Sequence, residues 1–268
     1  MKIGVLIKQV PATEKVKMDE ETGTMVRKGL ELELNPLDMY AVEEAIRLKE
    51  RLKKNVEITV ISMGPPSAIE AIKDAISMGC DKGYLISDRK FAGADTLATA
   101  YILFMAIKAL GGFDIIITGE RATDGETGQV GPSVAAQLDV PALTYISKIE
   151  EINKERVRVY REVEGGYEIL EAFPPLLLSV IKGINEPRLP NLAGKIKARN
   201  FKVPILNKDD LKVDSLRIGL NGSPTRVKKI FYPKLSRVGK IINAKNSEDA
   251  VDELIHFFKD KGIVGELK

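Results

Sequence analysis

The sequence predicts an α/β protein with a doubly wound, mainly parallel sheet. Two patterns indicate this fold class. Short aliphatic runs are bounded by Gly, Asp or Pro, as buried parallel strands usually are, and longer amphipathic stretches separate them, as crossover helices do. Apolar residues make up 44% of the 268 residues and charged residues 29%. This balance excludes a disordered chain, a collagen-like chain and a bundle of membrane helices, and the chain is long enough to bury its own core.

Strands are expected where aliphatic residues run together. They cover Lys2 to Ile7, Val56 to Ser62, Lys82 to Ile86, Phe113 to Thr118 and Leu176 to Ile181. Helices are expected between the first four strands. The clearest helix begins after Asn35-Pro36, and its apolar side is formed by Met39, Val42, Ala45, Ile46 and Leu48. The paired acids Glu43 and Glu44 are expected on the opposite, solvated face of this helix.

Two β-hairpins are expected in addition to this alternation. Residues 16–29 alternate around Glu21-Thr22-Gly23, and residues 157–171 alternate around Gly165-Gly166. Glycine in such turns permits the positive φ that tight hairpins require. The first hairpin would form an excursion at the carboxyl edge of the sheet.

The composition of the chain changes after about Ile184, where we place a domain boundary. Residues 1–184 are expected to form the α/β domain, and residues 185–268 a basic, proline-interrupted arm that ends in an amphipathic helix. The arm has 18 basic and 10 acidic residues, a net charge of +8, whereas the rest of the chain carries −5. Ser247 is the expected N-cap of the final helix. The apolar stripe of this helix must be buried either on its own domain or on another protein, and nucleic-acid binding is not expected because the arm lacks aromatic platforms.

The scarcity of cysteine and histidine excludes several kinds of site. Cys80 is the single cysteine and His256 the single histidine, so disulfide frameworks, multi-cysteine metal sites and histidine-dependent triads are excluded within this chain. We expect no metal site and no catalytic side chain, and any redox chemistry would require a bound organic cofactor. The first apolar run is too short for an export signal or a membrane span, so we expect a cytoplasmic protein that does not span a membrane.

The most informative segment is the glycine-rich loop of residues 119–128, which follows a predicted strand and precedes a helix that starts near Gly128. In an open parallel sheet this order places backbone N–H groups and a positive helix end at the carboxyl edge, where anions bind. Gly119, Gly125 and Gly128 permit close backbone approach, Thr127 can offer a hydroxyl to a phosphate, and Asp124 can bind a ribose or cap the helix. The alternative is an ordinary turn with capping residues.

Three further loops are expected at the same edge of the sheet. They are Leu6 to Lys8, Asn35-Pro36-Leu37-Asp38, and Ser62-Met63-Gly64-Pro65, each next to a predicted strand or helix end. Asn35 can also be read simply as a helix cap. In the third loop the backbone could bind an adenine edge while Met63 packs against the ring. Convergence of these loops on one edge predicts an adenine-nucleotide site.

Six motifs occur in an order and spacing that cover nearly all of residues 1–200: VLIKQVP, NPLDMYAVEEAIRLKE, SMGPP, AISMGCDKG, GERATDGETGQVGP and NEPRLPNLAGKIKAR. With these motifs the sequence resembles the beta subunits of electron-transfer flavoproteins. The resemblance implies an adenine-nucleotide site in an α/β domain and a heterodimer with an alpha subunit, whose own FAD exchanges electrons with dehydrogenases and a quinone or ferredoxin acceptor. It also implies that the C-terminal helix contacts the alpha subunit.

The resemblance implies the same nucleotide-binding residues that the loops suggest. They are Leu6, Lys8, Asn35, Pro36, Leu37, Asp38, Met63, Gly119, Arg121, Thr123, Asp124, Gly125, Glu126, Thr127 and Gly128. The run DGETGQVGP resembles the electron-bifurcating subgroup, in which this nucleotide is a second FAD that accepts hydride from NADH. Gly128 and Arg121 depart from that subgroup's pattern, so AMP, the structural ligand of the ordinary members, is the alternative.

The resemblance also implies a docking residue after the NEPR motif. Family members dock onto dehydrogenases through a protruding leucine, and the equivalent by motif is Leu192, although this sequence lacks the aromatic residue that others carry after the arginine. The competing interpretation of the whole chain is a stand-alone adenine-nucleotide-binding module of the universal-stress or nucleotide α-hydrolase type, which shares the α/β layout but needs no second subunit.

Overall fold

The computed structural model describes residues 1–12, 31–53, 55–228, 241, 243 and 246–263. The strands are β1 (Lys2–Ile7), β2 (Gln9–Pro11), β3 (Leu32–Leu34), β4 (Glu57–Met63), β5 (Lys82–Ile86), β6 (Ile115–Gly119), β7 (Ala142–Ile152), β8 (Val157–Val163), β9 (Gly166–Ala172), β10 (Leu176–Val180) and β11 (Ile205–Leu206). The α-helices are α1 (Pro36–Leu52), α2 (Ile69–Met78), α3 (Thr96–Ala109), α4 (Val130–Leu138), α5 (Leu192–Asn200), α6 (Lys208–Leu211) and α7 (Ser247–Asp260). Two short 3-10 helices cover Pro66–Ala68 and Arg89–Phe91.

The main sheet confirms the predicted fold class. Its strand order is β11-β5-β4-β1-β6-β10-β7-β8-β9, with parallel pairing from β11 to β7 and antiparallel pairing in the last two steps. The chain adds β4 and β5 on one side of β1 and then returns to add β6 on the other. The boundary between β1 and β6 is therefore the point where the winding direction reverses, which is where ligands bind in open α/β sheets.

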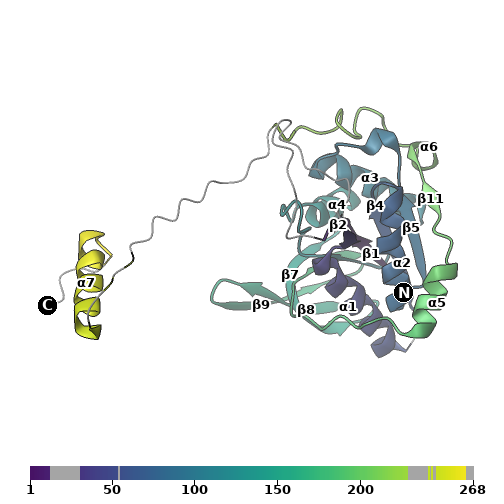
Figure 1. The fold of residues 1–268 in the computed structure, drawn as a ribbon. Helices are drawn as coiled ribbons and strands as arrows, with labels where there is room; N and C mark the ends of the chain where they lie inside the picture. Colours follow the sequence, from purple (N-terminus) through teal and green to yellow (C-terminus); the bar gives the residue numbers. More distant parts are fainter. Residues whose placement is uncertain (13–30, 54, 229–240, 242, 244–245, 264–268) are drawn as a thin grey trace. The chain divides into compact units, whose positions relative to one another are not determined.

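Helices cover both faces of this sheet (Figure 1). Residues of α1 and α2 pack on one face in a core with Ile3, Val5, Ile115 and Ile117, whereas residues of α3 and α4 pack on the other with Leu6 and Ile116. Successive strand residues alternate between the two cores because side chains of a strand point to opposite faces. A sheet buried on both faces requires the continuous aliphatic runs seen in the sequence.

One of the two predicted hairpins lies among the described residues. β8 and β9 pair from Val157↔Ala172 to Val163↔Gly166, which confirms the second hairpin. β2 pairs with β3, so the chain leaves and returns to the carboxyl end of β1 as expected. The first predicted hairpin itself, residues 16–29, lies outside the described residues.

The chain divides into two compact units, Met1–Ile230 and Phe231–Lys268. The predicted boundary after residue 184 thus falls inside the first unit, and the structure moves it to residue 230. The reason is tertiary packing: α5 packs on α2, β11 pairs with β5, and Asp95 accepts hydrogen bonds from Thr225. In the second unit, α7 has Asn246 rather than Ser247 as its N-cap, and none of its residues is buried. No helix of the described residues is long and apolar enough to cross a membrane.

Candidate functional site

The predicted nucleotide loops meet at the reversal point of the sheet. β1 and β6 are neighbours, so the chain that follows β1 at Lys8 and the loop that follows β6 at Gly119 leave the sheet side by side. α1 begins at the same edge, because the backbone N–H of Asn35 donates to the carbonyl of Lys8 over 2.9 Å. Segments that are far apart in the sequence are thereby brought to one edge.

Asn35 fastens the glycine loop. It is fully buried, its Nδ2 donates to the carbonyl of Arg121 over 2.9 Å, and its Oδ1 accepts from the backbone N–H of Thr123 over 3.3 Å. Its side chain makes no capping hydrogen bond to α1. Asn35 does occupy the N-cap position of α1, but its side-chain amide is used across the site instead of capping the helix.

Asp38 connects the start of α1 to both neighbouring strands. Its Oδ2 accepts from the backbone N–H of Lys8 over 2.7 Å. Burial raises the pKa of Asp38 to about 7, although hydrogen bonds from Lys8, Asn35 and Gly119 oppose the shift. Because this pKa lies near neutral pH, a small change in the surroundings of Asp38 would change the protonation of its carboxyl group.

Gly119 is required for the close contact between β6 and α1. A Cβ at this position would lie 2.5 Å from Asp38 Oδ1 and 2.7 Å from the carbonyl oxygen of Leu37. Pro36 occupies the first turn of α1, where a missing N–H costs no helical hydrogen bond. Pro36 and Leu37 therefore contribute to this edge through the backbone of the first turn of α1.

Two ion pairs flank the loop. Lys8 Nζ lies 2.6 Å from Asp124 Oδ1 and 2.8 Å from Oδ2, which ties the end of β1 to the loop. Arg121 pairs with Glu120 over 2.9 Å. Both cations are partly exposed, so they can also reach an anion that binds over the loop.

The glycines of the loop differ in what they do. Gly128 has φ +63°, a left-handed conformation that favours glycine. Gly125 is different, because a Cβ there would meet no protein atom within 4 Å. Glu126, with φ +51°, adopts the left-handed conformation without being glycine. The backbone of the loop is thus held in a left-handed conformation at two positions, and the side of Gly125 where a Cβ would lie is open.

The loop leads into α4, whose N-terminus carries no side-chain cap in the described structure. Thr127 Oγ1 lies 3.5 Å from the backbone nitrogen of Gln129, which precedes the helix. The first N–H groups of a helix need acceptors, and together with the helix dipole they favour an anion. Thr127, Gly128 and the start of α4 therefore offer backbone N–H groups and a hydroxyl of the kind that suits an anion.

The carboxyl end of β4 supplies one further polar group at this edge. Ser62 is fully buried, pairs with Ile7 in the sheet, and its Oγ has no hydrogen-bond partner among the described residues. An orphaned buried hydroxyl is costly and suits a site that receives a ligand. Met63 beside it is partly exposed, whereas the side chain of Leu6 is buried in the core on the α3 and α4 face. Of the predicted residues, Leu6 is thus the one whose side chain is turned into the core.

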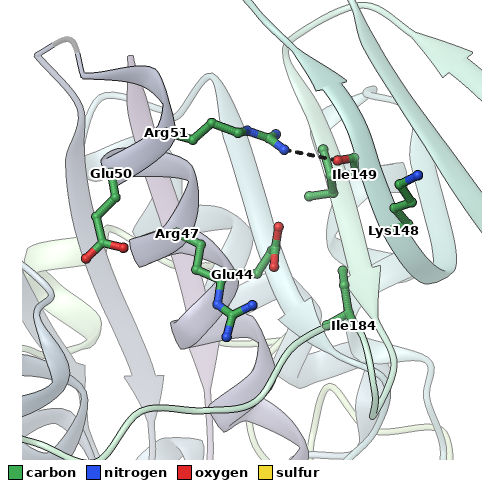
Figure 2. Close-up of a pocket in the computed structure, with 7 residues that line it drawn as sticks. All are labelled: Glu44, Arg47, Glu50, Arg51, Lys148, Ile149 and Ile184. Carbon is green, nitrogen blue, oxygen red and sulfur yellow. Dashed lines mark hydrogen bonds between the residues drawn. The ribbon is translucent and has the colours of Figure 1, made fainter.

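Two hollows lie next to β7. One, of about 510 Å³, is lined by Glu120, Tyr145, Glu162, Val163, Glu164, Ile181 and Lys182, and it reaches the residue next to Gly119. The other, of about 390 Å³, lies between α1 and β7 and is lined by charged residues around Ile149 and Ile184 (Figure 2). The first adjoins the glycine loop, and the second belongs to a different surface. Across the described ranges, no cluster of His, Cys, Asp and Glu is suited to hold a metal ion.

A second region lies after β10, at the predicted docking residue. Leu192 is 75% exposed, and Leu189, which was not predicted as a docking residue, is 89% exposed. The expectation that Glu43 and Glu44 face solvent is wrong, because both are buried and bound by residues of the NEPR motif. Helical periodicity did place these acids opposite the apolar stripe, but the returning chain covers that side of α1.

Comparisons with known proteins agree with this architecture. Residues 22–210 match the electron transfer flavoprotein domain. The electron transfer flavoprotein subunit beta of Thermoanaerobacterium thermosaccharolyticum is 45% identical, with 98% of this chain and 100% of that protein covered. The protein of the same name from Megasphaera elsdenii is 41% identical, covering 95% and 97%. The caffeyl-CoA reductase-Etf complex subunit CarD of Acetobacterium woodii is 38% identical, covering 98% and 100%. With a matching domain over most of its length and full-length relatives of this kind, the chain belongs to the electron transfer flavoprotein family, among its beta subunits.

Proposed function

We propose that this chain binds an adenine nucleotide at the loop of residues 119–128 and works as the beta subunit of a heterodimeric electron carrier. One observation supports the nucleotide site above all: the N-terminus of α4 has no side-chain cap, and the loop that precedes α4 is held by hydrogen bonds from the side chain of Asn35. Backbone N–H groups and a positive helix end, fixed in advance, suit a phosphate.

The roles of individual residues follow from their positions. Thr127, Gly128 and the first N–H groups of α4 would bind phosphate oxygens, and Lys8 and Arg121 would add positive charge. The unpartnered Oγ of Ser62, beside Met63, would bind the base or ribose. When FAD is the nucleotide, its isoalloxazine ring supplies the electron chemistry, and this chain binds, orients and shields it.

We favour FAD over AMP as the nucleotide. The hollow of about 510 Å³ beside Glu120 offers room for a group larger than a mononucleotide, and it contains the half-exposed ring of Tyr145. Tyr145 has φ +58°, an uncommon backbone conformation for an aromatic residue. With FAD here, NADH would be the hydride donor and electrons would divide between acceptors of high and low potential. AMP would instead make this subunit a structural one.

The partners we propose are an alpha subunit that carries FAD, a donor dehydrogenase, and a quinone- or ferredoxin-linked acceptor, in the cytoplasm. The name of the Acetobacterium relative places that protein in a complex with caffeyl-CoA reductase. The exposed leucines Leu189 and Leu192 would contact the dehydrogenase, and the unburied stripe of α7 would contact the alpha subunit.

The deciding experiment is to coexpress this chain with its alpha subunit, denature the purified complex, and count the FAD and AMP released per heterodimer. Two FAD would support the bifurcating form, whereas one FAD and one AMP would support the structural role. A complex with one FAD and no second nucleotide would contradict the proposal.

A variant with Gly125→Val tests where the second nucleotide binds. A Cβ at Gly125 would meet no protein atom within 4 Å, so we expect the fold to remain intact while the valine side chain fills the space over the loop. We expect loss of the second nucleotide with unchanged circular dichroism. Gly166→Ala, in the β8–β9 turn with equally open surroundings, is the matched control.

A further inference from the structure

The segment from Asn185 to Leu192 lies along α1 and is held there by side chains. Nδ2 of Asn185 donates to the carbonyl of Tyr40 and to Glu44 Oε2, both over 3.0 Å. Nη2 of Arg47 donates to the carbonyl of Glu186 over 3.1 Å. Figure 2 shows Glu44, Arg47 and Glu50 on α1, next to the chain that continues from Ile184.

Arg188 makes the most extensive of these contacts. Its Nε and Nη2 donate to the two carboxylate oxygens of Glu43 over 2.8 and 3.1 Å, and its Nη1 and Nη2 donate to those of Glu50 over 2.6 and 3.0 Å. Its backbone N–H also donates to Glu43 over 3.2 Å. One guanidinium therefore binds two carboxylates in bidentate fashion, and the orientation of the chain at residue 188 is fixed.

Glu43 is the buried centre of this cluster. It is 1% exposed and also accepts from Nε of Arg47 over 2.7 Å. Burial by itself would raise the pKa of Glu43, but the hydrogen bonds from Arg188 and Arg47 outweigh burial and hold the pKa below its ordinary value. The carboxylate stays charged, so the cluster persists at neutral pH.

The residues directly after this cluster are held at their other end as well. Asn191 caps α5, with its side chain accepting from the backbone N–H of Gly194 over 2.8 Å. Leu189 lies between Arg188 and Asn191, Leu192 is the first residue of α5, and their side chains are 89% and 75% exposed. Two large apolar side chains thus project from a short segment whose backbone is secured on both sides.

We propose that Arg188 is the positioning residue of the docking segment, defined here as residues 189–192. It holds the segment against α1, so the leucines are oriented before a partner arrives and less conformational entropy is lost on docking. This inference rests on the proposed function of Leu189 and Leu192 as contacts for a dehydrogenase. Lysine cannot replace Arg188, because an ammonium lacks the planar fork that binds two carboxylates.

The first test measures the mobility of the docking segment in the complex with the alpha subunit. In this chain Cys80 is fully buried and its pKa is raised to about 12, so a spin label attached to Leu192→Cys is selective here, once any reactive thiol of the alpha subunit has been removed. We expect the mobile fraction of the label to rise in Arg188→Lys and in Glu50→Gln. A label on Ala109→Cys, an exposed site at the end of α3, should be unaffected by Arg188→Lys. An unchanged signal at residue 192 in both variants would overturn the inference.

The second test separates this inference from the proposed function. The probe is a dehydrogenase chosen because it reduces the wild-type complex, with the complex as varied substrate. We expect Arg188→Lys to raise KM by about threefold to tenfold with unchanged kcat, since orientation and not electron transfer is altered. If Leu189→Ala with Leu192→Ala leaves KM unchanged, the docking role itself fails. If the leucine variant raises KM and Arg188→Lys does not, only the role of Arg188 is refuted.

Discussion

At the scale of single residues, Asn35 and Asp38 decide the shape of the proposed nucleotide site. Asn35 uses both ends of its amide on the glycine loop, and Asp38 accepts from the backbone of Lys8 at the adjacent strand end. Gly119 lets the strand end approach α1 closely enough for both contacts. These residues fix the loop, whereas Thr127 and the start of α4 are the groups that we propose bind phosphate.

Replacing Asn35 should loosen the loop. In Asn35→Ala two hydrogen bonds to the loop backbone are lost in a buried place, so we expect the free energy of unfolding to fall by about 1–3 kcal/mol and AMP affinity to fall as well. Urea unfolding and calorimetric titration with AMP measure the two effects. Asn153→Ala, which removes comparable backbone contacts in the β7–β8 turn, should lower stability and spare AMP binding. Equal AMP affinity in both variants would argue against the loop-fastening role.

Asp38 should give the stability of the protein a specific pH dependence. Its pKa is raised from 3.8 to about 7 by burial, so the folded protein binds more protons than the unfolded chain between these values. The contribution of Asp38 is therefore fully present below about pH 4 and is lost as the pH rises through about 7. We expect the stability of wild type minus that of Asp38→Asn to fall across this range in urea unfolding. A difference that rises with pH would contradict the assigned direction, and Asp252→Asn on α7 controls for loss of an exposed carboxylate.

At the scale of elements, α1 serves both regions. Its first turn lies at the glycine loop, and its middle and final turns bind Arg188 through Glu43 and Glu50. α5, which begins at Leu192, then packs on α2. The docking segment is thus attached at one end to α1, through Arg188, and at the other to α2, through α5. Both α1 and α2 cover the same face of the sheet.

The packing of α5 depends on Gly194. A Cβ at this position would lie 2.1 Å from the carbonyl oxygen of Ser77, at the end of α2. We expect Gly194→Ala to displace α5 and to lower the free energy of unfolding by about 1–3 kcal/mol, as overpacking does, while AMP binding is retained. Urea unfolding and AMP titration distinguish this from a defect in the nucleotide site. The control is Gly166→Ala, and a Gly194→Ala protein as stable as that control would show that α5 can adjust without cost.

At the scale of the whole molecule, the first unit, to Ile230, contains both candidate regions, and the second unit contains α7. α7 has an apolar stripe of Val251, Leu254 and Ile255, and none of these side chains is buried. A helix of this kind gains most of its stability from packing an apolar face. The alpha subunit is the surface we propose for it.

Removal of residues 246–268 should therefore weaken assembly with the alpha subunit while nucleotide binding to the first unit remains. Titration of alpha subunit into the full-length and truncated chains measures the loss. Leu254→Asp should reproduce much of it, because it places a charge in the stripe, whereas Asp252→Asn should not. Normal assembly of the truncated chain would mean that α7 has another role.

Local patterns in the sequence determined most of the elements. The predicted strands at Lys2–Ile7 and Lys82–Ile86 have the observed bounds, and the hairpin around Gly165 pairs as expected. The glycine loop and the loops at Lys8 and Asn35 were predicted to meet at one edge, because parallel strands align their carboxyl ends. Periodicity and turn residues act over a few positions, so one sequence is sufficient to find them.

Only the tertiary structure decided which distant residues are paired. Asn35 binds a residue 86 positions away, and Glu43 binds Arg188 across 145 positions. The side chain of Asn35 binds the glycine loop instead of capping α1. Glu43 and Glu44 lie in a buried cluster and not on a solvated face. Contacts of the same long range make residues 185–226 part of the first unit. Such pairs depend on the order in which strands are added to the sheet and on the chain that returns over α1, and no local pattern records either.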